Sequence, residues 1–355
     1  MPEFYLDEIW KAAVRGLQFG LAVTLVLGVG QLLGLLGGCI LCILLLTTTL
    51  GTTLALFIDT LQVPVKDKAV LITGCDSGFG YELALRLEKL GFVVFAGCLL
   101  ANKGGAGAQQ LKDARRRNIH VVQLDVSSDE EIRIAVEYVK KHLPSNGLWG
   151  VVNNAGIFTF GHVEWCSIDT AKSVMNVNVW GTLRIIKAFL PLVRQTKGRI
   201  VNVGSVSGRQ CSLNFTLYSI TKYSIEALSD SLRFEMRRFG VDVALIEPGN
   251  FASATKIFQP DAIRSTAMDM WKKLPDDVQN SYTQNYFDSV VNNMIKSQAT
   301  PTPHSLNMEP VLLSMTQALL QKFPHPRYQP ANFQYVLRTW VNTHLPEWVY
   351  EMFYI

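Results

Sequence analysis

The amino-terminal part of the chain contains 43 consecutive residues, from Gly16 to Ile58, without a single Asp, Glu, Lys or Arg. A helix that crosses a lipid bilayer needs about 20 apolar residues, so the run is long enough for two crossings. Because Gly37-Gly38 lies near its midpoint, we predict a helical hairpin over about 17–36 and 39–58 that anchors residues 1–60 in a membrane. One longer span followed by an apolar linker is the alternative.

Basic residues flank this run on both sides. Lys11 and Arg15 precede it, and Lys66 and Lys68 follow it. Positively charged residues favour the cytosolic side of a membrane, or the matrix side in a mitochondrion. Both ends of the hairpin, and the domain that follows it, are therefore predicted to lie on that side.

The rest of the chain has the composition of a globular protein. Charged residues make up 17% of the sequence, below the roughly 25% of soluble proteins, and the uncharged run accounts for the deficit. About 295 residues remain beyond residue 60, enough for one large domain or two small ones. A net charge of +4 without a basic domain predicts no nucleic-acid partner, and six scattered cysteines do not form a disulfide framework.

Short apolar runs alternate with helical segments after Pro64. The predicted strands cover 69–73, 92–96, 121–124, 148–152, 199–203 and 241–246, and the predicted helices cover 81–90, 129–142, 171–193 and 219–239. This alternation indicates βαβ units and an α/β protein with helices on both faces of a parallel sheet. Right-handed crossovers make it a doubly wound fold, in which ligands bind at the carboxyl ends of the strands.

A glycine-rich loop connects the first predicted strand to the first helix. This loop, Thr73–Gly80, has the sequence TGCDSGFG. Gly74, Gly78 and Gly80 let the backbone turn sharply and approach a pyrophosphate, and the helix beginning near Phe79 directs free N–H groups at that charge. The strand–turn–helix context favours a dinucleotide-binding loop, and a tight turn with no ligand is the alternative.

Polar and small residues also lie where later strands end. The sequence Asn153-Asn154-Ala155-Gly156 follows the fourth strand, Ser205 follows the fifth and Pro248-Gly249 follows the sixth. Tyr218 and Lys222 open the next helix, four residues apart and therefore on one face. A Tyr–Lys pair at this spacing is usually a solvated surface pair. Its combination with the other elements, in this order, indicates a catalytic site.

These elements together resemble the short-chain dehydrogenase/reductase family. The motifs TGxxxGxG, NNAG, Ser…Tyr-x-x-x-Lys and PG match from Ala69 to about Thr255. Within the family, TGCDSGFG and Phe95–Leu99 (FAGCL) are similar to the branch that contains D-β-hydroxybutyrate, retinol and type 2 17β-hydroxysteroid dehydrogenases. The likeness to the hydroxybutyrate enzymes extends through Arg327-Tyr328 and Thr343–Pro346. It divides the chain into a Rossmann-type domain over 66–295 and a carboxy-terminal extension over 296–355.

The resemblance implies an NAD(P)-dependent oxidoreductase that interconverts a secondary alcohol and a ketone. Tyr218 would take the alcohol proton if its pKa falls from about 10 towards 7, which the positive charges of Lys222 and of the nicotinamide favour. Ser205 would hold the substrate oxygen by a hydrogen bond. The family's fourth catalytic position, an asparagine that holds a relay water, matches Asn178. Asn176 is a competitor, but the spacing to Gly181 favours Asn178.

The cofactor is predicted to be NAD rather than NADP. Gly97–Leu100, after the second strand, has no acid for the adenine ribose and no adjacent Arg or Lys for a 2′-phosphate, which Asp76 would repel. Asp125 resembles the family's adenine-contacting aspartate, and a place in the N-cap region of a helix over Ser127–His142 is the alternative. No metal site is predicted. The cofactor-binding residues implied by the resemblance are Gly74, Asp76, Ser77, Gly78, Phe79, Gly80, Asp125, Val126, Asn153, Ala155, Gly156, Tyr218, Lys222, Pro248, Gly249 and Thr255.

The likeness through the carboxy-terminal tail favours 3-hydroxybutyrate and acetoacetate as the substrate pair, and an apolar alcohol is the alternative. A hydroxybutyrate carboxylate needs a cation, and Arg209 is the candidate in the loop between Ser205 and Tyr218, with His162 as a weaker one. The rest of that loop is uncharged, which suits a steroid or retinoid alcohol instead. A non-catalytic dinucleotide-binding scaffold on the same fold is the alternative of another class.

The last 60 residues are rich in aromatic residues and proline, which suits a substrate lid or a surface in contact with membrane lipid. The apolar run predicts an integral membrane protein. The resemblance, which does not include that run, implies an enzyme of the endoplasmic reticulum or mitochondrion and is compatible with a homo-oligomer.

Overall fold

The computed structural model describes residues 12–25, 40–114, 118–255, 258–299 and 306–354. The chain divides into two compact units. One comprises Met1–Pro64 and Leu320–Pro324, and the other comprises Val65–Leu319 and His325–Ile355.

The first unit contains the predicted membrane segment. Helix α2 (Ile40–Thr60) matches the second predicted helix, and its part Ile43–Thr60 is the one stretch of the described residues long and apolar enough to cross a membrane. The helical stretch Ala12–Leu25 covers part of the first predicted helix and is shorter. Since positions 26–36 of that helix lie outside the described residues, the two-span arrangement stays a prediction.

The two apolar helices cross where their residues are small. A Cβ atom added to Gly16 would lie only 2.0 Å from Thr52 Oγ1, and one added to Gly51 would lie 3.2 Å from Gly16 Cα. Small residues allow apolar helices to approach this closely. Arg15 at the start of one helix forms a 2.6 Å salt bridge with Asp59 at the end of the other. The helices are therefore antiparallel, as a hairpin requires.

The second unit is built on a seven-stranded sheet with the order β3-β2-β1-β4-β5-β6-β7, in which all pairings are parallel. The predicted α/β fold is confirmed, and β7, which is too short to show a pattern in the sequence, was not predicted. The strands are β1 (Ala69–Thr73), β2 (Val93–Cys98), β3 (Ile119–Gln123), β4 (Leu148–Asn153), β5 (Arg199–Val203), β6 (Asp242–Ile246) and β7 (Arg327–Tyr328).

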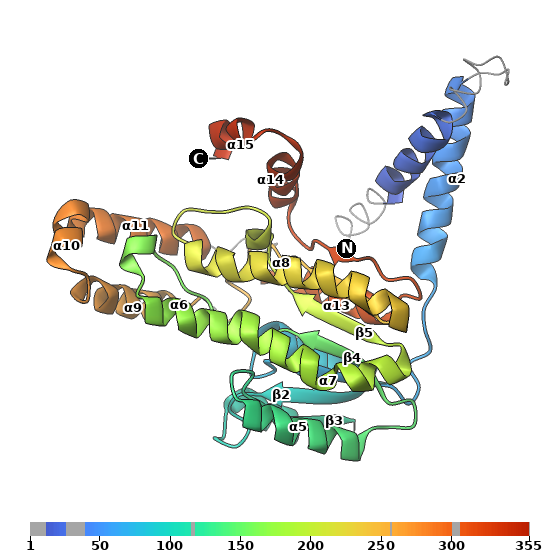
Figure 1. Ribbon diagram of the computed structural model, residues 1–355, viewed down its shortest axis with the longest axis horizontal. Coiled ribbons are helices and arrows are strands. Elements are labelled where there is room, and N and C mark those ends of the chain that lie inside the picture. Colours follow the sequence, from blue (N-terminus) through green and yellow to red (C-terminus); the bar gives the residue numbers. More distant parts are fainter. Residues whose placement is uncertain (1–11, 26–39, 115–117, 256–257, 300–305, 355) are drawn as a thin grey trace. The chain divides into compact units, whose positions relative to one another are not determined.

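Helices cover both faces of the sheet (Figure 1). Helices α5, α7 and α8 lie on the face turned towards the viewer, while α3 and α13 lie behind it, where Arg86 and Glu309 pair. The helices of this unit are α3 (Gly78–Lys89), α4 (Ala106–Asp113), α5 (Asp129–His142), α6 (Ile168–Met175), α7 (Thr182–Thr196), α8 (Thr216–Met236), α9 (Pro260–Lys272), α10 (Asp276–Tyr282), α11 (Gln284–Ala299), α13 (Glu309–Leu320), α14 (Phe333–His344) and α15 (Glu347–Tyr354).

Burial of apolar strands fixes the sheet between these layers. Every residue of β1 and β4 is buried, as expected of parallel strands covered on both faces. Leu71, Phe95 and Phe189 are fully buried in the main core beneath α5, α7 and α8. Helices α9 and α11 pack against each other around a second core, which includes Trp165, Phe258 and Phe287. The carboxyl ends of the strands are thereby held in fixed positions.

The helix predicted over 171–193 is divided. A π-helical stretch, Asn176–Gly181, separates α6 from α7. Two tertiary contacts lie at this wider turn: Gly181 lies against Val126, and Asn178 bonds to the loop after β4. Such π-helical turns occur often at functional sites. The predicted domain boundary at residue 295 falls within α11, and β7, from the carboxy-terminal extension, joins the sheet.

Candidate active site

The glycine loop between β1 and α3 has the shape of a phosphate cradle. Gly74 and Gly78 have φ values of +72° and +60°, in the left-handed region that favours glycine. A Cβ atom on Gly80 would lie 2.4 Å from the Gly74 carbonyl oxygen. Helix α3 begins at Gly78, and its N-cap residue Ser77 makes no side-chain capping bond. The first N–H groups of α3 are thus available to an anion, and the loop fits a dinucleotide pyrophosphate.

Hydrogen bonds join this loop to the segment after β4. Thr73 Oγ1 accepts from the backbone N–H groups of Asn154 and Ala155, each over 3.0 Å. The Asn154 amide donates to the carbonyl oxygens of Thr73 and Gly74 over 2.9 and 3.1 Å. The glycine loop and the Asn-Asn-Ala-Gly segment therefore form one continuous wall.

Two acidic side chains lie on the same side of the site. Asp76 accepts from the backbone N–H groups of Leu99 and Leu100 over 2.8 and 3.0 Å, so its carboxylate lies just beyond β2, where the sequence has no acid of its own. Asp125 Oδ1 accepts from both the N–H and the hydroxyl of Ser127. The N-cap of α5 is Ser128, so Asp125 closes the preceding turn rather than capping the helix.

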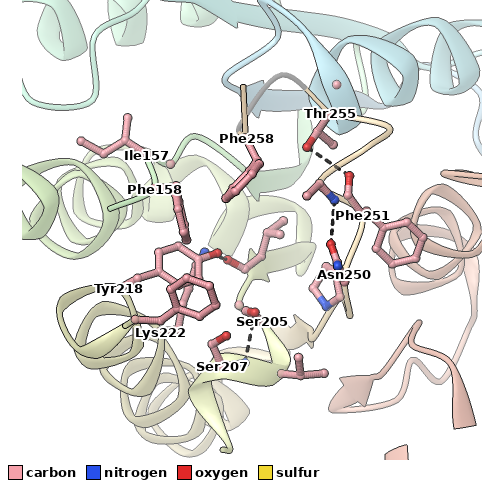
Figure 2. Close-up of a pocket in the computed structure, with 18 of the residues that line it drawn as sticks. Ile157, Phe158, Ser205, Ser207, Tyr218, Lys222, Asn250, Phe251, Thr255 and Phe258 are labelled. Atoms are coloured by element: carbon pink, nitrogen blue, oxygen red, sulfur yellow. Dashed lines mark hydrogen bonds between the residues drawn. The ribbon is translucent and has the colours of Figure 1, made fainter. Parts of the chain in front are cut away.

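A cavity of about 1120 Å³ extends from the glycine loop to the helices of the carboxy-terminal extension. Figure 2 shows part of its lining. Gly80 and Asn153 do not line it, since Asn153 is buried in β4 and donates to Asn202 on β5 over 2.8 Å. Asn154 lines it but was absent from the predicted set. The predicted cofactor residues that line the cavity are Gly74, Asp76, Ser77, Gly78, Phe79, Asp125, Val126, Ala155, Gly156, Tyr218, Lys222, Pro248, Gly249 and Thr255.

Ser205, Tyr218 and Lys222 come together in this cavity (Figure 2). Ser205 lies two residues after β5, where its hydroxyl accepts from the Ser207 N–H over 3.1 Å and is also hydrogen-bonded to the Tyr218 phenol. Lys222 lies one turn after Tyr218 on α8, with Nζ 5.5 Å from the centroid of the tyrosine ring. The three predicted catalytic side chains thus converge from β5 and α8.

Burial controls the acidity of this pair. It raises the pKa of Tyr218 to about 12, against the opposing effect of the Ser205 hydrogen bond. It lowers the pKa of Lys222 to about 8, although the Glu226 carboxylate acts in the other direction. The predicted fall of the Tyr218 pKa towards 7 is therefore not produced by the protein's own groups, because desolvation penalises both the phenolate and the ammonium.

Asn178 is buried between the active-site loop and α8. Its side-chain oxygen accepts from the Ile157 N–H over 2.8 Å, and its amide donates to the Ile157 carbonyl and to Thr221 Oγ1 over 2.9 and 3.1 Å. Asn176 bonds instead to the Arg184 guanidinium. Asn178 therefore connects the loop after β4 to the residue that precedes Lys222.

The structure does not bring Arg209 into the cavity. Its guanidinium lies 3.4 Å from the buried carboxylate of Glu247, and Arg209 is absent from the lining. His162 stacks on Trp165 and is likewise absent. The arginine that does line the cavity is Arg338 on α14. Sequence reasoning missed it because it lies 120 residues beyond Tyr218 and no local motif marks it.

Aromatic side chains lie beside Tyr218 in the cavity, and Figure 2 shows two of them, Phe158 and Phe258. The ring centroid of Phe158 lies 5.2 Å from that of Tyr218, 5.3 Å from that of Phe215 and 5.8 Å from that of Phe258. The substrate side of the cavity therefore combines an apolar wall with the polar groups that converge on Tyr218.

The chain matches the short chain dehydrogenase family over residues 68–262. It belongs to the short-chain dehydrogenase/reductase family. This family match includes the glycine loop and both active-site elements, β5 and α8.

Curated relatives share most of this short-chain dehydrogenase's length. It is 45% identical over 295 residues to the mitochondrial D-beta-hydroxybutyrate dehydrogenase of Bos taurus, covering 82% of this chain and 85% of that protein. It is 38% identical over 289 residues to 17-beta-hydroxysteroid dehydrogenase type 6 of Bos taurus, covering 80% and 88%. A short chain dehydrogenase/reductase from Burkholderia phymatum, solved in complex with NAD, shares the fold with a TM-score of 0.61 at 20% identity, covering 78% and 92%.

The short-chain dehydrogenase described here is an NAD(P)-dependent oxidoreductase that acts on a CH–OH group of a small molecule.

Proposed function

We propose that the protein interconverts a 3-hydroxy acid of the 3-hydroxybutyrate class and the matching keto acid, with NAD as cofactor. One observation carries the reaction type: Ser205, Tyr218 and Lys222 line the same cavity as the glycine loop. The relative named D-beta-hydroxybutyrate dehydrogenase, 45% identical to this chain, supports the substrate class.

The glycine loop would hold NAD, which would supply the acceptor for the hydride that leaves the alcohol carbon. Ser205 holds the substrate oxygen. Its hydroxyl accepts from the Ser207 N–H, and the hydrogen that it shares with the Tyr218 phenol can be donated to that oxygen instead. Tyr218 takes the alcohol proton as general base. With a pKa of about 12 the phenol gives up its own proton only when more positive charge lies near it than the protein's own groups supply. The positive nicotinamide of bound NAD would add that charge to the charge of protonated Lys222.

Asn178 is proposed to position Lys222 and a relay water. Its bond to Thr221 fixes the turn of α8 that carries the lysine, and its bonds to Ile157 fix the loop that borders the cavity. A displaced lysine would no longer offset the phenolate charge.

The preference for NAD rests on Asp76. Its carboxylate lies against Leu99 and Leu100 at the end of β2, beside the expected place of the adenine ribose. Charge repulsion at that place disfavours the 2′-phosphate of NADP.

A steroid or retinoid alcohol is the second candidate substrate. The rings of Phe158, Phe215 and Phe258 favour it, because they offer an apolar wall beside Tyr218. The relative named 17-beta-hydroxysteroid dehydrogenase type 6 gives it further support. A non-catalytic scaffold is the third, and the intact Ser205, Tyr218 and Lys222 speak against it.

Residues 1–60 are proposed to anchor the protein in a membrane, with the catalytic domain on the cytosolic or matrix side. The antiparallel pairing of Arg15 with Asp59 supports a hairpin. Exposed aromatics of α14 and α15, such as Phe333 and Trp348, are proposed to contact lipid. A mitochondrial membrane is favoured by the name of the bovine relative, and the endoplasmic reticulum is the alternative.

Deletion of residues 1–60 tests this anchor. A chain that begins at Leu61 keeps the Val63 N–H bond to the Leu320 carbonyl and the bond between Lys322 and Leu61. It should lose carbonate-resistant membrane association and keep NAD binding. Retention in carbonate-washed membranes would show that another segment is the anchor.

The substrate assignment is tested by NADH formation from purified protein in lipid vesicles. The panel contains D-3-hydroxybutyrate, a 17β-hydroxysteroid and all-trans-retinol. We expect the highest kcat/KM for the hydroxy acid. Turnover of the steroid or retinol alone would assign the apolar substrate, and NAD binding without any turnover would favour a scaffold.

A further inference from the structure

Two basic side chains occur among the described residues that line the cavity, Lys222 and Arg338. Lys222 already has a role beside Tyr218, the proposed general base. Arg338 comes from α14 of the carboxy-terminal extension. The acidic side chains of the same lining are Asp76 and Asp125, at the cofactor end, so the substrate end carries positive charge without a matching acid.

Arg338 is held in one orientation. Its Nε donates to the Tyr350 hydroxyl over 2.8 Å, and the guanidinium lies 5.3 and 5.2 Å from the ring centroids of Tyr350 and Tyr354. An Nη2 donor also points to the carbonyl oxygen of Cys211 at 3.4 Å. No carboxylate in the described parts of the chain pairs with it. A positioned arginine without an acidic partner suits an anionic ligand.

Gln210 gives a second, independent indication. Only 2% of its surface is exposed, it lines the cavity, and its Oε1 has no hydrogen-bond partner within the described residues. A buried amide oxygen that lacks a partner is costly, so a ligand is expected to complete the bonding of this amide. A half-turn of the amide group exchanges its oxygen and its NH₂ group, so the NH₂ group can take the unpartnered position and donate to an oxygen of that ligand.

Helices α14 and α15 bond to the loop segment that carries Gln210. Asn342 of α14 donates to the Arg209 carbonyl over 2.6 Å, and Tyr350 of α15 donates to the Cys211 carbonyl over 3.2 Å. These two carbonyls flank Gln210, and the second also accepts from Arg338. The amide and the guanidinium thus meet at one short segment of the loop after Ser205.

We propose that Arg338 and Gln210 form the carboxylate-binding end of the substrate site, and that α14 and α15 thereby select a hydroxy acid over an apolar alcohol. The proposal rests on the proposed function and deepens it, because it names the groups that recognise the acid. The arginine fork supplies charge and directed donors, and the glutamine amide supplies a further donor. Lipid-like alcohols have no group that satisfies these donors.

The test compares D-3-hydroxybutyrate with its methyl ester, which has the same reacting carbon and no charge, in the full-length protein in lipid vesicles. Arg338→Gln should lower kcat/KM for the acid by about 30-fold or more, as expected when a charged hydrogen-bonded pair loses one partner. It should change kcat/KM for the ester by less than about threefold. Arg264→Gln is the matched control, because Arg264 bonds to Asn292 between α9 and α11 and is absent from the lining.

Gln210→Glu gives a second readout, since it keeps the shape of the side chain and repels a carboxylate. This variant should also reduce turnover of the acid and not of the ester. It tests the proposal by itself if Arg338→Gln does not fold. An equal loss on acid and ester in both variants would show a structural role only and would overturn the inference while leaving the proposed function intact. A wild-type protein that oxidises apolar alcohols but not 3-hydroxybutyrate would instead overturn the proposed substrate, and this inference with it.

Discussion

Lys222 donates from Nζ to the carbonyl oxygen of Val203 over 3.0 Å. Val203 is the last residue of β5, two positions before Ser205, so this bond fastens the lysine of α8 to the strand that carries the serine. Tyr218 lies one helical turn before Lys222. The relative positions of all three side chains thus depend on the contact between one strand end and one helix.

Tyr218→Phe should abolish most turnover without loss of NAD binding. The ring remains in contact with Phe158, so the packing is kept, while the group that takes the proton is removed. Removal of a general base typically lowers the rate by about 10² to 10⁴. The measurement is kcat together with NAD affinity by titration. Near-normal kcat in this variant would remove Tyr218 from the mechanism.

Stability should depend on pH through Lys222. Burial lowers its pKa from 10.5 to about 8, so between these values the unfolded chain binds a proton that the folded protein does not. Stability contributed by this group therefore rises with pH across that window, by about 3 kcal/mol from about 1.4 kcal/mol per pKa unit.

Lys222→Met isolates this effect, because methionine fills a similar volume and does not titrate. Thermal unfolding in detergent at several pH values from 8 to 10.5 should show the wild type gaining stability relative to the variant. If stability depended on pH in the same way in both proteins, the pKa of Lys222 would not be lowered by folding.

Asp76→Asn should weaken the preference for NAD over NADP by about tenfold or more, since a change of 1.4 kcal/mol in relative binding suffices. The asparagine keeps most of the volume and one acceptor for Leu99 or Leu100, but it removes the charge. The readout is the ratio of kcat/KM for the two cofactors. Asp125→Asn is the control, because Asp125 lines the same cavity but bonds to Ser127. An unchanged ratio in Asp76→Asn would assign cofactor choice to other residues.

Asn178→Ala should destabilise the protein by about 1–2 kcal/mol, because the N–H and carbonyl of Ile157 lose a partly buried partner and Thr221 Oγ1 loses a buried one. It should also lower kcat, since Thr221 and the following lysine lose a fixed contact. The partner variant Asn176→Ala removes a half-buried bond to Arg184 and should change kcat little. Equal effects of the two substitutions would contradict the choice of Asn178.

Local patterns were enough to predict six of the seven strands and the glycine loop. The strand over 69–73 and the helix over 129–142 have the predicted bounds, because an apolar run and a capped amphipathic helix are determined by neighbouring residues. The positive φ values of Gly74 and Gly78 follow from the same local chemistry.

Features set by tertiary contacts could not be predicted in this way. The π-helical stretch around Asn178 accompanies contacts with Val126 and Ile157, which are distant in the sequence. Arg209 was the nearest basic residue to Tyr218 in its loop, yet it pairs with Glu247, and the docking of α14 brings Arg338 to the cavity instead. Burial of Tyr218 raises its pKa, and a sequence motif does not report burial.

Tyr218 and Lys222 are proposed to carry out NAD-linked oxidation of a hydroxyl group in this cavity. The most direct test measures NADH fluorescence when the full-length protein, in lipid vesicles, receives NAD and D-3-hydroxybutyrate, with Tyr218→Phe beside it. We predict saturable NADH formation by the wild type and a decrease of at least about 100-fold in the variant. A wild-type protein that binds NAD but forms no NADH from the hydroxy acid, the steroid or retinol would contradict the claim.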